Sequence, residues 1–224
     1  MWPWVASVCD QGSTSSCVGQ ALANAVTIRE AVCGYGWNPA SALFAYWYAR
    51  YKSGAGIVDD GTYIRSACNV MVKLGIPDEK YWPMSSWKVN RQPPPSATMQ
   101  AHPRSGGVYV GIFDIGSMRA DAVKACIAAD IPVIAGFRID DAFVSDSGPE
   151  VIDTPYAPRY GHAMAIIGYK PDPTHVTLYE ILNSWGYSWR KGGRAWITEA
   201  YLRSISRVGD LTAVHGWKRI AGPV

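Results

Sequence analysis

The chain has 224 residues, 48% hydrophobic and 17% charged, which allows one large domain or two small lobes and argues against intrinsic disorder. Its formal net charge of +3 is small and scattered, which argues against nucleic acid or a membrane surface as a partner. We find no secretory signal and no transmembrane stretch, so we expect a cytoplasmic or otherwise non-secreted protein, unless it is secreted after processing.

The first half of the chain has the apolar spacing of helices. A serine cap, Ser15 or Ser16, precedes an expected helix over residues 17–32. An Asn-Pro pair opens a second expected helix over 38–51. A third helix is expected over 63–74, because glycine and proline follow its end.

A change of pattern separates this helical part from a strand-rich part. The segment 82–107 is rich in proline and glycine and is predicted to be a surface connection at a lobe boundary. One further helix is expected over 118–129, with Ser117 as its cap. Short apolar runs predict the strands 108–113, 132–139, 162–169, 176–182 and 194–198. The sequence therefore predicts an α+β protein, with a mainly helical lobe over 1–105 and a mainly β lobe over 106–224.

The cysteines and histidines lack the spacing of a metal site. The five cysteines include no C-x-x-C pair and the four histidines no tight pair, so neither a metal nor another cofactor is expected. An odd number of cysteines leaves at least one free thiol. Cys68 and Cys126 fall in amphipathic patterns and are expected to be structural thiols.

Cys17 stands where the first helix is expected to begin. The unpaired backbone N–H groups and the helix dipole at that position favour an anion, and the thiolate is the reactive form of cysteine. Taken alone, Cys17 has two interpretations: a nucleophile, or a buried structural thiol, which is the commoner state of cysteine.

Three more polar residues favour the nucleophile. His162 opens one predicted strand and Asn183 closes another, so both can lie at one end of a sheet, where the amide would hold the tautomer of the ring. Gln11 precedes Cys17 and can donate an amide N–H to an oxyanion. Each also has an ordinary structural alternative, as a satisfied core histidine or as a turn residue that caps local backbone.

The order of these motifs resembles the papain-like cysteine peptidases. Gln-Gly-Ser precedes Cys17, His162-Ala begins a strand, and Asn183-Ser-Trp-Gly follows, with Trp185 and Trp189 where that family has tryptophans. Three segments resemble bacterial-type members: 59–63, 74–76 and 81–83. The resemblance implies a papain-like two-lobe fold, with a helical N-terminal lobe, a β-barrel-like C-terminal lobe and the active site in the cleft between them.

The resemblance also implies a mechanism. Cys17 and His162 would form a thiolate–imidazolium pair that hydrolyses a peptide or protein substrate through a thioester intermediate. Asn183 would orient His162, and Gln11 would complete an oxyanion hole with the backbone N–H of Cys17.

The resemblance further suggests residues for substrate binding, and the chain departs from the family at two positions. Gly61 would lie beside the substrate backbone, and Trp185 would shield the histidine–asparagine hydrogen bond from water. Thr14 replaces a half-cystine that secreted members use, and Val18 replaces an aromatic residue after the nucleophile. The chain thus resembles a member without the usual disulfide next to the catalytic cysteine. A proteinaceous inhibitor or a pro-segment, neither included in this chain, would be a further partner.

Two other functions remain open at this stage. A cell-wall amidase or isopeptidase would use the same residues, although Gln-Gly-Ser and Asn-Ser-Trp-Gly favour the peptidase. A catalytically silent papain-like scaffold could serve binding or structure, but such a scaffold has no physical need for Gln11, Cys17, His162 and Asn183 together.

Overall fold

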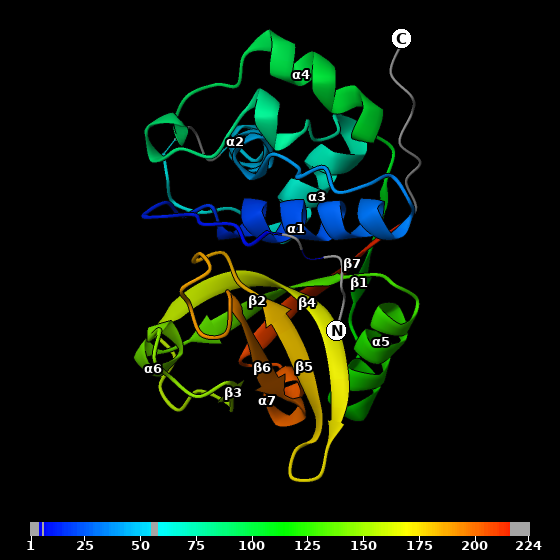
Figure 1. Ribbon diagram of the computed structural model, residues 1–224, viewed down its shortest axis with the longest axis vertical. Coiled ribbons are helices and arrows are strands. Elements are labelled where there is room, and N and C mark those ends of the chain that lie inside the picture. The colour runs from blue at the N-terminus through cyan, green and yellow to red at the C-terminus, as the bar shows by residue number, and fades with distance from the viewer. Residues whose placement is uncertain (1–4, 6, 55–57, 216–224) are drawn as a thin grey trace.

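Helices form one side of the molecule. The computed structural model describes residue 5 and residues 7–54 and 58–215. The helices of this side are α1 (Cys17–Val32), α2 (Ala42–Lys52), α3 (Ile64–Lys73) and α4 (Pro95–Ala101). Single turns of 3-10 helix occupy Glu79–Tyr81, Ser86–Lys88 and His102–Arg104. Figure 1 shows α1 beneath the other three helices, on the side that faces the sheet.

The helix α1 is buried on almost every side. From Val18 to Ala31 only Arg29 is not buried. Gly19 lets α1 cross α2 closely, because a Cβ atom at Gly19 would lie 2.4 Å from the carbonyl oxygen of Ala42. The apolar side chains of α1 pack against helices on one side and against the sheet on the other, so α1 joins the two parts of the fold.

The predicted start of α2 is wrong. Its cap is Ser41, whose Oγ accepts a hydrogen bond from the N–H of Phe44 at 3.2 Å. Asn38 instead makes a local turn, because its side-chain amide donates to the carbonyl of Tyr35 at 3.0 Å. The cap therefore lies three residues after Asn38, and the helix begins at Ala42.

Two further predictions of local structure also need correction. The segment 82–107 contains α4, which begins at Pro95, because proline fits the first helical position, where its missing N–H would have no partner. Ser117 is not a cap: it lies inside α5 (Gly116–Ala128), and Ile115 occupies the N-cap position.

A seven-stranded sheet forms the other side. The strands are β1 (Val108–Ile112), β2 (Val133–Ile139), β3 (Val151–Ile152), β4 (Tyr160–Asp172), β5 (Val176–Leu182), β6 (Arg194–Thr198) and β7 (Val208–His215). Their order is β1-β7-β2-β4-β5-β6-β3, and every pairing is antiparallel except that of β3 with β6. The short helices α6 (Asp141–Val144) and α7 (Glu199–Arg203) complete the chain order. Strand β7 was not predicted, yet it lies between β1 and β2.

Alternation along β4 divides the core between the two faces of the sheet. Ala163, Ala165 and Ile167 pack toward α1 and the other helices of its side. Met164 and Ile166 pack into a second cluster with residues of α5 and α7. One face of the sheet is therefore covered by α1, which places the N-terminal end of that helix beside the strands.

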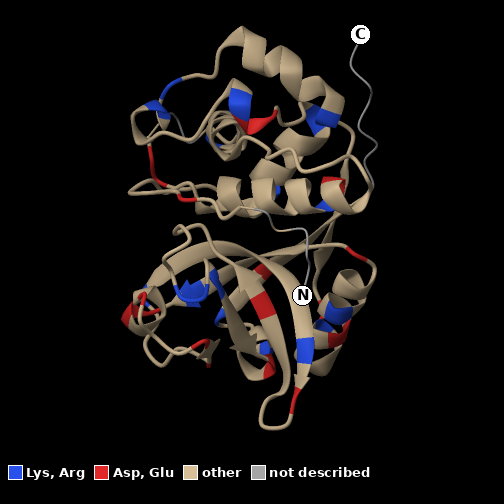
Figure 2. Ribbon diagram, viewed as in Figure 1, with Lys and Arg blue, Asp and Glu red and all other residues tan. Residues whose placement is uncertain are grey.

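Charged residues are dispersed over both parts of the molecule, without a band of one sign in the view of Figure 2. Within the described part of the chain, no helix combines the length and the apolar character that crossing a membrane requires.

Candidate active site

Cys17 is the first residue of α1 and is partly buried. The N-cap residue, Ser16, makes no side-chain hydrogen bond to the helix. Burial raises the pKa of the Cys17 thiol, and the backbone N–H groups of Cys17, Val18 and Ala163 on β4 act on the sulfur in the opposite direction. The N-terminal end of α1 and the start of β4 therefore meet at the sulfur atom.

His162 and Asn183 lie on neighbouring strands. The pairing of β4 with β5 places Ala165 opposite Leu182, so the residue after β5 lies beside the start of β4. Nε2 of His162 is 2.7 Å from Oδ1 of Asn183, and both side chains are buried. The N–H of Ser184 also donates to Oδ1 of Asn183, at 2.8 Å. Because Oδ1 can only accept, Nε2 carries a proton and Nδ1 is the nitrogen not engaged by Asn183.

Trp185 covers the imidazole. Its ring stacks on that of His162 with 4.5 Å between centroids and 26° between planes. Trp189 and Phe143 pack around Trp185 at near-perpendicular angles, with centroids 5.6 Å and 6.1 Å away. This aromatic cluster therefore packs over the imidazole that is hydrogen-bonded to Asn183.

Gln11 ties the loop before α1 to the segment after β5. Its backbone N–H donates to the carbonyl of Ser184 at 2.8 Å, and the Ser184 hydroxyl donates to Oε1 of Gln11 at 2.7 Å. The side-chain amide of Gln11 donates one hydrogen to the carbonyl of Thr14 at 2.7 Å. An amide nitrogen carries two hydrogens, so the second remains available to another acceptor.

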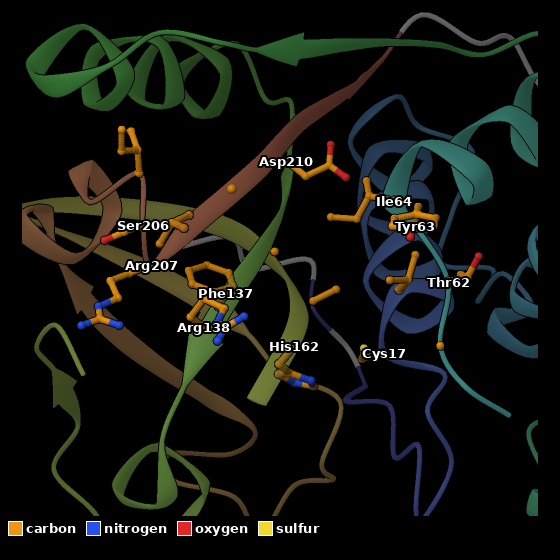
Figure 3. Close-up of a pocket in the computed structure, with 18 of the residues that line it drawn as sticks. Cys17, Thr62, Tyr63, Ile64, Phe137, Arg138, His162, Ser206, Arg207 and Asp210 are labelled. Atoms are coloured by element: carbon orange, nitrogen blue, oxygen red, sulfur yellow. The ribbon is translucent and has the colours of Figure 1, made fainter. Parts of the chain in front are cut away.

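Two cavities share Cys17, His162 and Gly61. One, of about 560 Å³, extends over β2 and β7 as far as Asp210. The other, of about 510 Å³, extends along Gln11 and Trp185. Gly61 has a φ of +86°, a conformation that favours glycine. Figure 3 shows Cys17 and His162 near one another at one end of the larger cavity, with Asp210 farther along it.

Burial opposes a single charge on either member of the Cys17–His162 pair. Burial raises the pKa of the Cys17 thiol and lowers the pKa of His162 to about 4, while the hydrogen bond that Nε2 donates to Asn183 raises the pKa of the ring. Transfer of the thiol proton to the ring creates both charges together, and their attraction offsets part of the desolvation. Without such a transfer, burial favours the neutral thiol and the neutral ring.

The other cysteines have different environments, and none of the five cysteines forms a disulfide. Burial raises the pKa of Cys9 to about 12 and that of Cys68 to about 12, which keeps both protonated at neutral pH. Cys33, after the end of α1, is exposed and far along the helix from Cys17.

The structure brings together all the residues that sequence patterns had singled out. Gln11, Cys17, Gly61, His162 and Trp185 line one cavity, and Asn183 holds the ring from behind. Among the described residues, no group of three or more His, Cys, Asp or Glu side chains is arranged to hold a metal ion.

Sequence reasoning missed Asp59 and Tyr46. Asp59 had been noted only within a segment of family resemblance, and Tyr46 looked like an ordinary aromatic residue of a helix core. The carboxylate of Asp59 accepts from the N–H of Ser15 and from the Tyr46 hydroxyl. No local pattern signals such a contact, since its partners are far apart in the chain.

Comparison with known proteins gives one family. A family model described as "Papain family cysteine protease" matches residues 4–205. A peptidase C1-like protein of Acanthamoeba polyphaga mimivirus, itself uncharacterized, is 27% identical over 203 residues, which are 85% of this chain and 64% of the viral protein. The chain therefore spans less than two thirds of the length of that relative.

Solved structures of the same fold cover nearly the whole chain. Xylellain, a cysteine protease from Xylella fastidiosa, has a TM-score of 0.82 at 26% identity, over 95% of this chain and 83% of its own. A Carica candamarcensis cysteine protease in complex with E-64 has a TM-score of 0.73 at 21% identity, over 95% and 93%. Digestive procathepsin L 3 of Tenebrio molitor has a TM-score of 0.77 at 17% identity, over 95% and 67%. The last two likenesses concern the fold alone.

Proposed function

Because this chain belongs to the papain family of cysteine proteases, we propose that it hydrolyses peptide bonds of peptide or protein substrates with Cys17 as the nucleophile. The observation that carries the proposal is the buried hydrogen bond of 2.7 Å between Nε2 of His162 and Asn183, together with the cavity that His162 and Cys17 both line. It leaves Nδ1 of the ring to exchange a proton with the thiol.

In the first half of the reaction, a thiolate at Cys17 attacks the carbonyl carbon of the scissile bond. The new C–S bond forms as the carbonyl electrons move to oxygen, and the free N–H of Gln11 and the backbone N–H of Cys17 stabilise that oxyanion. Collapse of the tetrahedral intermediate breaks the C–N bond. The imidazolium of His162 donates its proton to the leaving amine, which departs and leaves a thioester.

In the second half, water replaces the amine. Neutral His162 accepts a proton from the water, whose oxygen attacks the thioester carbonyl, and the C–S bond then breaks. The products are a carboxylic acid and the Cys17 thiolate paired again with imidazolium. Asn183 keeps the ring in one orientation throughout, and Trp185 keeps water from its hydrogen bond.

Replacement of the nucleophile tests this proposal. We expect Cys17→Ala to abolish hydrolysis of a mixed peptide library followed by mass spectrometry, because no other group supplies the thiolate. Cys33→Ala is the matched control, since it removes an exposed thiol outside the site and should leave turnover unchanged.

Two outcomes would contradict the proposal. Equal turnover by the wild type and Cys17→Ala would mean that another group performs the chemistry. Release of soluble fragments from peptidoglycan by the wild type, without cleavage of peptides, would identify a cell-wall amidase instead.

A further inference from the structure

The carboxylate of Asp59 joins two loops that border the candidate site. Both of its oxygens accept from the backbone N–H of Ser15, at 3.1 Å and 3.2 Å. Ser15 belongs to the loop that runs from Gln11 to the start of α1. Asp59 itself lies two residues before Gly61, which lines both cavities.

Helix α2 holds this carboxylate in place through Tyr46. The Tyr46 side chain is fully buried, and its hydroxyl donates to Asp59 at 2.6 Å while it accepts from the N–H of Gly61 at 2.9 Å. One hydroxyl therefore orients both the carboxylate and the glycine. Because its ring is packed on all sides, Tyr46 has few alternative conformations and supports both loops rigidly.

One turn later on α2, Arg50 fixes the same segment from its other end. Its guanidinium lies 4.0 Å from the centre of the Tyr46 ring and donates to the carbonyl of Val58 at 2.5 Å and to Asn90 at 2.9 Å. Residues 58–61 are thus bound to α2 at both ends.

We propose that Asp59 is a positioning residue: it transmits the rigid placement of α2 to the loop that carries the oxyanion donors and to the glycine that faces the substrate. The proposal rests on the proposed function, since it concerns the same site. In chemical terms, the carboxylate fixes the backbone of Ser15, two residues before the thiol, so that Gln11 and the Cys17 N–H meet the developing oxyanion at the correct distance.

The charge of Asp59 does not activate the thiol, because a carboxylate acts against a nearby thiolate. Its negative charge raises the pKa of Cys17. The carboxylate is therefore useful to the site through its hydrogen bonds and despite its charge. Removal of the charge and removal of the hydrogen bonds should then have opposite effects, which separates the two experimentally.

The test compares Asp59→Ala with Asp59→Asn. The alanine variant loses every hydrogen bond, so we expect kcat to fall roughly 10- to 100-fold with little change in KM. The asparagine variant keeps one acceptor oxygen and should retain more activity. It should also move the acid limb of kcat/KM to lower pH, because the thiolate no longer faces a negative charge.

Two further variants sharpen the test. Tyr46→Phe keeps the buried ring but removes the hydroxyl, and its effect should not add to that of Asp59→Ala, because both break one network. Asp121→Asn removes an equal charge from a carboxylate that is paired with Lys124 on α5, and it should leave kcat and the pH profile unchanged.

An unchanged kcat in a folded Asp59→Ala protein would overturn the proposal. So would an activity loss that only follows the fraction of unfolded protein, or additive effects of Asp59→Ala and Tyr46→Phe. If the wild type does not turn over peptides, the proposed function fails and amide hydrogen exchange still decides the positioning. We expect exchange at Ser15 and Gly61 to accelerate at least roughly tenfold in Asp59→Ala, and unchanged exchange would refute the role.

Discussion

Asn183 uses one oxygen atom to hold two neighbours. Oδ1 accepts from the Ser184 N–H and from Nε2 of His162, so the first contact fixes the amide and the second fixes the ring. An acceptor at Nε2 favours the protonated imidazole and therefore raises the pKa of His162, although burial lowers it more. Asn183 therefore influences both the orientation of the imidazole and the pH at which the ring holds its second proton.

Replacement of this amide should change the pH profile in a defined direction. In Asn183→Ala the pKa of His162 falls further, so imidazolium is lost at lower pH. We expect the alkaline limb of kcat/KM to move to lower pH and kcat to fall at least roughly tenfold. Asn38→Ala, in a surface turn, is the control. A limb that stays in place or moves to higher pH would contradict this assignment.

At the scale of elements, a pair of glycines on neighbouring strands lines the larger cavity. Gly136 on β2 lies opposite Gly209 on β7. A Cβ atom at Gly209 would meet nothing within 4 Å, whereas one at Gly136 would lie 3.4 Å from the carbonyl oxygen of Gly209, so the open space lies above Gly209. The cavity starts at Cys17 and is large enough to receive a substrate side chain.

Filling this space should change which substrates are cleaved. We expect Gly209→Leu to lower kcat/KM roughly tenfold or more for peptides with a bulky side chain at the position that enters the cavity. Peptides with glycine or alanine there should lose much less. A peptide library digested by both proteins measures the difference, and a uniform loss across the library would show that the cavity does not select side chains.

The elements differ in how far the sequence predicts them. Helix α1 and the strands β5 and β6 have the predicted bounds, and each is buried along most of its length. Strand β7 escaped prediction, since its pairing with β1 and β2 depends on residues about a hundred and about seventy positions away. The papain-like α+β fold that the motifs implied is confirmed by the family match and by the similar structures.

The candidate site likewise contains residues that the sequence predicts and residues that it does not. Gln11, Cys17, His162 and Asn183 could be found from the order of short motifs, and the structure brings them together, although their catalytic roles stay proposals. Asp59 could not be found, because its partners Ser15 and Tyr46 are determined by tertiary packing alone.

At the scale of the whole molecule, one half-buried acid, Glu79, should make stability depend on pH. Burial raises the pKa of Glu79 to about 7, from 4.5, while the N–H of Met84 and the charge of Lys88 act in the opposite direction. The charge of Glu79 also acts on Cys9, where it adds to the effect of burial and raises the pKa of the thiol. Between these two pKa values the folded protein keeps a proton that the unfolded chain has lost, so the free energy of unfolding falls as pH rises through this window and stays low above it.

Replacement of this acid by its amide should remove that dependence. Between about pH 5 and about pH 8, we expect the free energy of unfolding to fall less in Glu79→Gln than in the wild type. The difference between the two proteins should be at most about 3 kcal/mol. Urea unfolding at both pH values measures this. Glu150→Gln, at an exposed carboxylate paired with Lys191, is the control. The same pH dependence in the wild type and Glu79→Gln would contradict the expectation.

The burial of α1 has a consequence for inactivation. Its first residue is Cys17, and the following turns are packed between the other helices and the sheet. A fluctuation that moved the thiol away from the ring would have to release this helix, and with it the contacts that join both parts of the molecule. Cys17 therefore cannot move away from His162 by local fraying of the helix end. We expect the geometry of the site to be lost together with the fold, in one cooperative transition.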